Sequence, residues 1–394
     1  MNVRDLAEKY SDYIIERRRY YHSCPELSGQ EEHTSASLRA DLEAMGVEVT
    51  PCTTCHGLVG LIRGGKAKPG CKTVALRADI DGLKVTEETG LPFASTNGAM
   101  HACGHDNHMS MLLGAAKILT EVRDQLPGNV KLLFQPAEEI AMGAKQMVAE
   151  GVLDGVDAIY GAHIWGDFDA PLIDVSAGNR MACCDSFKLE IEGVSAHGSA
   201  PHLGVDAVVA AASVIMNLQT YVSRHNNPLN PLVLTVGTIN GGQRFNIIAN
   251  RVKMEGTVRT FSRETLENIE QDMQKIVGDT AAALGAKGTV TEYNHLTPPV
   301  INDNAQLNEI AQKAVVKLYG EEGLGHMPTL MGSEDFAFFM DKVPGIYGFL
   351  GSRDRAKGYV YSNHHEKYTV DESTLKRGAA VYAQFAIDFL EANA

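Results

Sequence analysis

The densest group of potential metal ligands lies in the segment Met100–His108, which reads Met-His-Ala-Cys-Gly-His-Asp-Asn-His. Cys103, His105 and their neighbours bring thiol, imidazole and carboxylate groups within a few positions of one another. These donors together suit a borderline metal ion such as Zn or Mn. The alternative is a polar loop whose histidines occur by chance, but apolar chain flanks the segment on both sides. The segment therefore predicts a metal site.

Two adjacent carboxylates, Glu138 and Glu139, follow an apolar run that ends at Gln135. Pro136 ends that run and fixes the turn. Because adjacent residues point in different directions, one carboxylate could ligate a metal while the other faces a bound water and acts as a general base. The alternative is a solvated helix N-terminus, where acidic residues are favoured anyway. Taken alone, the pair does not decide between these two interpretations.

Two further histidines complete a possible ligand set. His163 ends the apolar run Ala158–His163, and His364 lies in a polar loop near the C-terminus. Either histidine alone is more often structural than a ligand. The combined set is large enough for a two-metal site, in which metals about 3.5–4 Å apart generate a hydroxide nucleophile near neutral pH. Its members are Cys103, His105, Glu139, His163 and His364.

Two other motifs could support or add to this chemistry. Asp79 and Asp81 follow an apolar run, and their spacing of two places both side chains on one face, where they could orient ligand imidazoles. A charged strand end is an equal alternative for either residue. Cys52 and Cys55 resemble half of a zinc knuckle, but no second Cys-x-x-Cys follows, so we do not expect a structural zinc.

The elements that must position these residues follow from the hydrophobic pattern. Short apolar runs such as Thr73–Arg77 and Val130–Gln135 alternate with helical patterns such as Thr34–Met45 and His108–Val122. This alternation predicts an α/β fold: a three-layer domain with a central, mostly parallel sheet. Open α/β sheets bind ligands in the loops after their strands, so the candidate ligands can converge on one edge.

The pattern changes between residues 181 and 294. Strands are expected at Asp185–Glu192, Leu232–Ile239, Arg251–Thr260 and Gly288–Tyr293, with helices at Val205–Ser223 and Glu264–Leu284. This β-α-β-β-α-β order is that of a ferredoxin-like α+β module. We therefore expect residues 1–180 and 295–394 to form one split domain, with 181–294 inserted as a second.

The inserted module carries polar residues that could contact a substrate. His197 lies with His202 in a loop punctuated by Gly and Pro, although a solvent-facing loop is the alternative. Asn246 and Arg259 are expected near facing strands, thirteen positions apart. Arg259 could clamp a substrate carboxylate in a bidentate manner.

Composition narrows the classes of partner. The 394 residues include 35 basic and 49 acidic side chains, a net charge of −14, which disfavours nucleic acids and anionic membranes. No apolar run is long enough to span a bilayer, and no secretion signal is recognised, so seven cysteines in a large chain favour a reducing cytoplasm.

The ordered motifs resemble those of the M20 metallopeptidase family, over nearly the whole chain. The segments Met100–Asp106, Gln135–Glu139 and Gly161–Trp165 appear in the family's order, preceded by Arg18–Leu27 and followed by His364–Glu372. The most similar branch contains hippurate hydrolase, N-acyl-amino-acid hydrolases and auxin-conjugate hydrolases. The resemblance implies a metal-dependent amidohydrolase that splits N-acyl or N-aroyl amino acids into a carboxylic acid and a free amino acid.

The resemblance also implies roles for single residues. Two divalent ions (Zn, Mn, Co or Ni) would be held by the five ligands named above, with Glu138 as general base for a metal-bound hydroxide mechanism. His197 would stabilise the oxyanion, and Asn246 and Arg259 would hold the substrate carboxylate. The inserted module would be a lid and dimerisation domain, so a homodimer is expected. A dinuclear dipeptidase or aminopeptidase is the alternative activity, and a non-catalytic metal-dependent binding protein is a third hypothesis.

Overall fold

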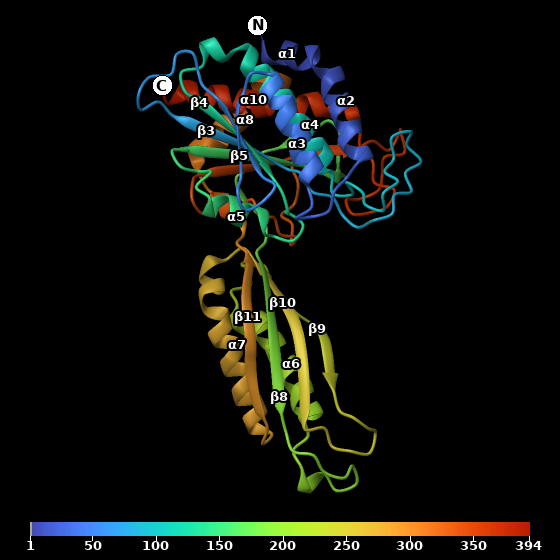
Figure 1. The fold of residues 1–394 in the computed structure, drawn as a ribbon. Helices are drawn as coiled ribbons and strands as arrows, with labels where there is room; N and C mark the ends of the chain where they lie inside the picture. Colours follow the sequence, from blue (N-terminus) through green and yellow to red (C-terminus); the bar gives the residue numbers. More distant parts are fainter. Residues whose placement is uncertain (1) are drawn as a thin grey trace. The chain divides into compact units, whose positions relative to one another are not determined.

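The computed structural model describes residues 2–394 and divides into two compact units (Figure 1). Unit 1 comprises Met1–Gly178, Ile301–Pro328 and Asp335–Ala394, and unit 2 comprises Asn179–Val300 and Thr329–Glu334. Each unit has its own cluster of buried apolar side chains. Unit 2 is therefore inserted into the chain of unit 1 and has a separate core.

Unit 1 is built on a seven-stranded sheet with the order β1-β2-β4-β3-β5-β13-β6. Its strands are β1 (Glu48–Pro51), β2 (Leu58–Ile62), β3 (Thr73–Asp79), β4 (Asn129–Gln135), β5 (Ala158–Asp169), β6 (Ile173–Asp174) and β13 (Gly345–Arg353). The central strands β4, β3, β5 and β13 are parallel, whereas β1, β2 and β6 pair antiparallel with their neighbours. The α/β class is confirmed, but the sheet is mixed, and the predicted parallel arrangement holds only for its centre.

Helices lie on both faces of this sheet. They are α1 (Val3–Lys9), α2 (Ser11–Ser23), α3 (Glu32–Ala44), α4 (His105–Glu121), α5 (Gly143–Ala149), α8 (Ala305–Tyr319), α9 (Ala337–Met340) and α10 (Leu375–Ala392). α4 packs against α2 and α10, and α5 packs against α9. In Figure 1, α10 and α5 lie on opposite sides of the sheet. Covered on both faces, β3 is buried along its whole length, including its charged residues Arg77 and Asp79.

Helix α4 begins earlier than its apolar pattern predicts. We expected a helix from His108, but the first helical residue is His105. Most of α4 is buried on all sides, so the polar residues Asp106 and Asn107 are accommodated by buried partners and not by solvent. The polar start of α4 is therefore part of the interior of unit 1.

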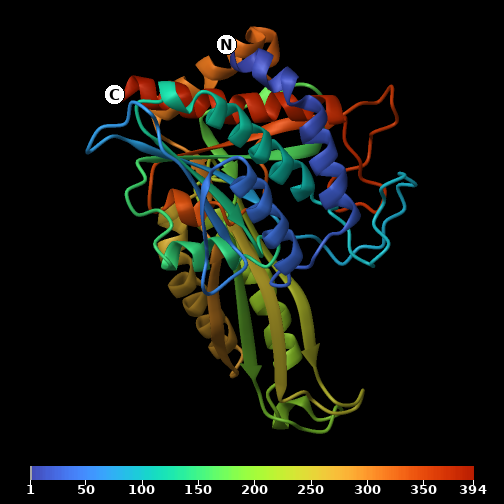
Figure 2. The same ribbon diagram turned by 45° about the horizontal axis from the view of Figure 1, so that its top comes forward.

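Unit 2 contains a four-stranded antiparallel sheet with the order β11-β8-β10-β9. Its elements are β8 (Cys184–Glu192), α6 (Ala207–Thr220), β9 (Leu232–Gly241), β10 (Arg251–Thr260), α7 (Arg263–Ala283) and β11 (Lys287–Thr297). Two short strands, β7 (Gly178–Met181) and β12 (Val300–Asn302), lie where the chain passes from one unit to the other. α6 and α7 pack against each other and against the sheet (Figure 2). The succession of strands and helices is the predicted β-α-β-β-α-β.

Within residues 2–394, the structure has no helix that combines the length and the apolar character needed to cross a membrane.

Candidate metal centre

The turn into α4 carries the first two candidate ligands. Gly104 caps α4 with φ 98°, a left-handed conformation that favours glycine. A Cβ atom at Gly104 would lie 2.6 Å from Cγ2 of Ile164, so a larger residue would have to displace the Ile164 side chain. Gly104 thus holds Cys103 and His105 on either side of a tight turn, and both side chains are buried.

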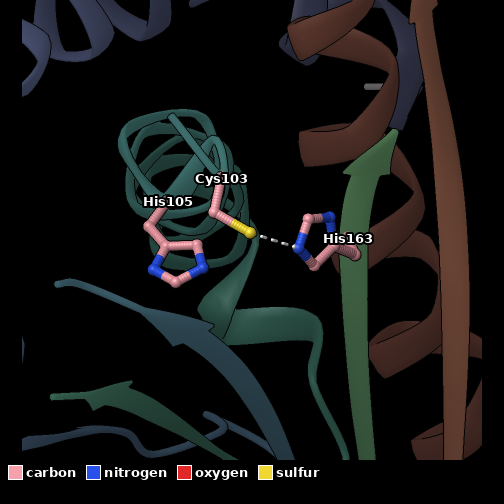
Figure 3. A group of neighbouring side chains, drawn as sticks. All are labelled: Cys103, His105 and His163. Atoms are coloured by element: carbon pink, nitrogen blue, oxygen red, sulfur yellow. Dashed lines mark hydrogen bonds between the residues drawn. The ribbon is translucent and has the colours of Figure 1, made fainter. Parts of the chain in front are cut away.

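Four segments of unit 1 bring the predicted ligands together. Sγ of Cys103 lies 3.3 Å from Nε2 of His163 on β5 (Figure 3) and 3.2 Å from Nε2 of His364. His364 Nε2 lies 3.7 Å from Oε1 of Glu139, which is 3.9 Å from Nε2 of His105. All five predicted ligands therefore belong to one cluster. His163 occupies the middle of β5 and not its end, because β5 continues to Asp169.

The two adjacent carboxylates both face this cluster. Ala137 turns the chain after β4 with φ 52°, and Glu138 Oε2 then lies 4.0 Å from Nε2 of His105. The backbone N–H of Asp335 points to Oε1 of Glu138 at 3.5 Å, and the N–H of Glu139 donates to Oδ2 of Asp81 at 3.1 Å. The carboxylates are only about a tenth exposed, with side-chain values of 11% and 10%. They do not belong to a solvated helix end.

The donor atoms fit a bound metal. Among residues 2–394, His105 Nε2 and Glu139 Oε1 are buried atoms that lack a hydrogen-bond partner. Buried polar atoms rarely lack a hydrogen-bond partner unless they contact an ion or a water molecule. The potential metal-holding groups include Cys103–His105–His163, Cys103–Glu139–His364 and His105–Glu138–Glu139, which share members. Thiolate, imidazole and carboxylate in overlapping sets suit two transition-metal ions side by side.

The electrostatics of the cluster support the same conclusion. Burial raises the pKa of Cys103 well above its usual value, and Glu139 and Glu138 add to this shift. Burial also raises the pKa of Glu139 to about 7, although His105 acts against it. For His105, the charges of Asp79 and Asp81 outweigh burial and raise the pKa to about 10. A cation in the cluster would reverse these shifts, because metal ligands bind in their deprotonated forms.

Asp79 and Asp81 each form a hydrogen bond with an imidazole, but only the partner of Asp81, His105, is a predicted ligand. Asp81 accepts from Nδ1 of His105 through its backbone oxygen at 2.9 Å, with Oδ1 at 3.1 Å. This bond leaves Nε2 of His105 directed at the cluster. Asp79 pairs with Nδ1 of His108, and Nε2 of His108 accepts the backbone N–H of Ile164 at 2.8 Å. His108 is therefore structural, tying α4 to β5.

Replacing Asp81 with Ala is expected to weaken metal binding about 10–100-fold, because His105 loses the partner that orients its ring. Asp81→Asn should give a smaller loss, since its amide oxygen can still accept a hydrogen bond. Competition with a coloured chelator would measure both. The exposed Glu309→Ala, which removes a carboxylate paired with Lys313, is the matched control and should bind metal as the wild type does.

A buried polar network around Asp335 was not anticipated from the sequence. Asp335 accepts hydrogen bonds from Gln135 at 2.8 Å and from the backbone of Ala144 at 3.1 Å, and it pairs with Arg77 at 3.1 Å. Arg77 is also paired with Asp79 at 2.7 Å. The available signal was a single arginine within the apolar run of β3. Through Asp335, this network joins β3 to β4 and α5, the two elements that flank Glu138 and Glu139 in the chain.

The residues predicted to contact substrate lie in unit 2, at two separate places. His197 and Asn246 line one cavity of about 410 Å³ with Arg244, and the N–H of Gly198 donates to the Asn246 carbonyl at 2.8 Å. Arg259 lies near the end of β10 and donates to Ser333 Oγ at 3.1 Å. The structure therefore brings His197 and Asn246 together but does not bring Arg259 to them within one chain.

Comparison with known proteins agrees with the fold and the metal cluster. Residues 75–388 match the family model described as peptidase family M20/M25/M40. The N-acetyl-L-cysteine deacetylase of Bacillus subtilis is 38% identical, with 96% of this chain and 89% of that protein covered. The IAA-amino acid hydrolase ILR1-like 2 of Arabidopsis thaliana is 38% identical, with coverages of 97% and 86%. The structure of the Bacillus subtilis YXEP protein, a dinuclear metal-binding peptidase from the M20 family, superposes with a TM-score of 0.85 at 33% identity, covering 98% of this chain and 99% of that one.

Fold, ligand cluster and relatives together define a metal-dependent hydrolase of amide bonds. The chain belongs to the M20/M25/M40 peptidase family.

Proposed function

We propose that this enzyme hydrolyses the amide bond of N-acyl or N-aroyl amino acids, releasing a carboxylic acid and a free amino acid. The observation that carries this proposal is the pair Glu138–Glu139, both within about 4 Å of His105 Nε2 in a cluster that fits metal ions. The names of two similar proteins, an N-acetyl-L-cysteine deacetylase and an IAA-amino acid hydrolase, support N-acyl amino acids as the class of substrate.

In this proposal two divalent ions, of Zn, Mn, Co or Ni, are held by Cys103, His105, Glu139, His163 and His364. Such ions, when bound, polarise the amide carbonyl and lower the pKa of water. Glu138 accepts the proton of the attacking water and returns it to the leaving amine nitrogen. The Asp335 N–H lies 3.5 Å from Oε1 of Glu138, and its other oxygen, Oε2, lies 4.0 Å from Nε2 of His105.

We further propose that unit 2 is the lid and dimerisation domain, within the division 1–180, 181–294 and 295–394. His197 stabilises the oxyanion, while Asn246 and Arg259 hold the substrate carboxylate. Arg251 and Arg259 lie near opposite ends of β10, and the rise of the strand separates their Cα atoms by about 26 Å. Asn246 precedes Arg251 in the chain and lies beyond that end of the strand, farther still from Arg259. A small substrate cannot touch Asn246 and Arg259 of the same chain. The three residues can serve one substrate only if two copies contribute.

The surface of unit 2 offers an interface for such a dimer. β9 is an edge strand, and its Val233 and Ile239 are 38% and 52% exposed. On the neighbouring α6, Val209 and Met216 are 54% and 68% exposed. An edge strand flanked by exposed apolar side chains is suited to pairing with another chain. These features support a homodimer through unit 2.

Mixing two inactive variants tests the shared site. His197→Ala and Glu138→Gln should each be nearly inactive alone. After joint unfolding and refolding, the mixture should recover about a quarter of the wild-type activity, because half of the dimers are mixed and each mixed dimer has one intact site. No recovery, with mixed dimers demonstrated by a tag on one variant, would show that His197 acts within its own chain.

A dinuclear dipeptidase or aminopeptidase activity is the second candidate, favoured by the similarity to a structure named as a peptidase. Release of free amino acids from a panel of N-acyl amino acids and dipeptides, followed by mass spectrometry, separates the two. Cleavage of acyl substrates with little dipeptide cleavage supports our proposal. Cleavage of dipeptides alone would replace it with the peptidase activity.

A further inference from the structure

A pair of cysteines lies in unit 1 apart from the metal cluster. Cys52 and Cys55 occupy the turn between β1 and β2, where the N–H of Cys52 donates to the Gly57 carbonyl at 2.8 Å. Their sulfur atoms lie within 4.8 Å of each other, and both residues are half-buried. Cys52 also lines a surface cavity of about 260 Å³, so small reagents can reach the turn. The proposed hydrolysis uses neither thiol.

Glu150 holds this turn in place from the end of α5. Its carboxylate accepts the backbone N–H groups of Thr53 and Thr54, each at 2.7 Å. The hydroxyl of Thr53 donates to it at 3.0 Å, and the hydroxyl of Thr54 donates as well. The two residues between the cysteines are thus fixed by a charged acceptor. The two sulfur atoms are kept close without help from a cross-link.

The same hydrogen bonds argue against a metal ion at this turn. A carboxylate offers about four lone-pair sites, and Thr53 and Thr54 fill them with four donors. Glu150 is close enough to Cys52 and Cys55 to be the third ligand of a metal ion, but its oxygen atoms already accept these four hydrogen bonds. Two thiols without a free third ligand are better suited to forming a bond with each other.

We propose that Cys52 and Cys55 form a reversible disulfide, making this turn an oxidation site separate from the metal centre. The oxidant is a hydroperoxide. One thiolate attacks the peroxide, the O–O bond breaks, and a sulfenic acid and an alcohol or water form. The second thiol then attacks the sulfenic sulfur, the S–S bond forms, and the hydroxyl group leaves as water with the thiol proton. A dithiol reductant reverses the change by thiol–disulfide exchange.

The attacking thiol is that of Cys55. A hydrogen bond from the Cys52 thiol lowers the pKa of Cys55, which favours its thiolate form. The same interaction raises the pKa of Cys52, which then acts second. A lowered thiol pKa together with partial exposure is characteristic of reactive cysteines.

Peptide mapping of the metal-loaded, full-length protein tests the proposal. The protein is treated with hydrogen peroxide, its free thiols are blocked with an alkylating reagent, and it is digested. We expect the peptide that contains Cys52 and Cys55 to be unalkylated and to have the mass of the reduced peptide minus two hydrogen atoms. Dithiothreitol should restore both thiols. Alkylation of both cysteines, or their conversion to sulfinic or sulfonic acid, would overturn the proposal.

Variants sharpen the test. Cys71→Ser removes another half-buried thiol of unit 1, and it should leave disulfide formation unchanged. Glu150→Ala should lower the equilibrium constant for the disulfide in a glutathione buffer about tenfold, the effect of losing a hydrogen bond to a charged group. An unchanged constant in Glu150→Ala would contradict the anchoring of the turn by Glu150.

Zinc binding is the competing outcome. Zinc content is compared between the wild type and the double variant Cys52→Ser/Cys55→Ser, both of which should hydrolyse substrate equally well. Equal zinc content supports the disulfide. Loss of one zinc equivalent in the double variant would make the turn a metal site and overturn the proposal.

Discussion

Glu138→Gln should lower kcat about 10²–10⁴-fold, the typical contribution of a general base, while metal content stays at the wild-type level. The glutamine keeps the shape of the side chain but cannot accept the water proton. Glu139 and the other four proposed ligands remain in place, so metal binding is retained. Steady-state kinetics on an N-acyl amino acid, with metal analysis of the same sample, measure both quantities.

Two comparisons make this result specific to Glu138. Glu139→Gln should lose metal as well as activity, because Glu139 Oε1 is one of the unpartnered atoms in the cluster. Glu309→Gln, on the exposed face of α8, should change neither quantity. A fully active Glu138→Gln enzyme would remove Glu138 from the mechanism and leave the base unassigned.

Removing metal ions with a chelator should abolish turnover and lower the thermal stability of the enzyme. A ligand present at about 1,000 times its Kd stabilises the folded state by about 4 kcal/mol, and this stabilisation is lost on chelation. For a chain of 394 residues, the loss corresponds to a fall in Tm of about 5 °C. Differential scanning calorimetry and activity assays before and after reloading with Zn or Mn measure the two effects.

The variant His364→Ala separates metal removal from other effects of the chelator. It lacks one proposed ligand, so its Tm should already be low and should change little on chelation. The double variant Cys52→Ser/Cys55→Ser should respond as the wild type does. Full activity in a sample shown to be metal-free would exclude the proposed centre.

The convergence of the candidate metal ligands could be predicted from the sequence. Ligand types, their order and the apolar runs before them predicted that Cys103, His105, Glu139, His163 and His364 converge, and the structure places them within contact distance of one another. This worked because the parallel strands at the centre of the sheet carry segments distant in sequence to one edge. The β-α-β-β-α-β pattern of unit 2 was equally clear from periodicity alone.

Other features depend on partners that no local pattern reveals. Arg77 is buried in β3 between two counter-charges, its neighbour Asp79 and Asp335, which lies more than 250 positions later and which no local pattern connects to it. The start of α4 lies at His105 because buried partners accept its polar first turn. The antiparallel edges of the sheet are likewise set by which strands become neighbours.

The sequence by itself determined which side chains have the chemistry of metal ligands and approximately where helices and strands form, because residue type and periodicity are local properties. Only the tertiary structure decided the rest. It separated Arg259 from His197 and Asn246 along β10, and it placed Glu150 on the turn that holds Cys52 and Cys55 together. Distances between segments depend on how strands pair and helices pack, and these long-range contacts form only in the folded chain.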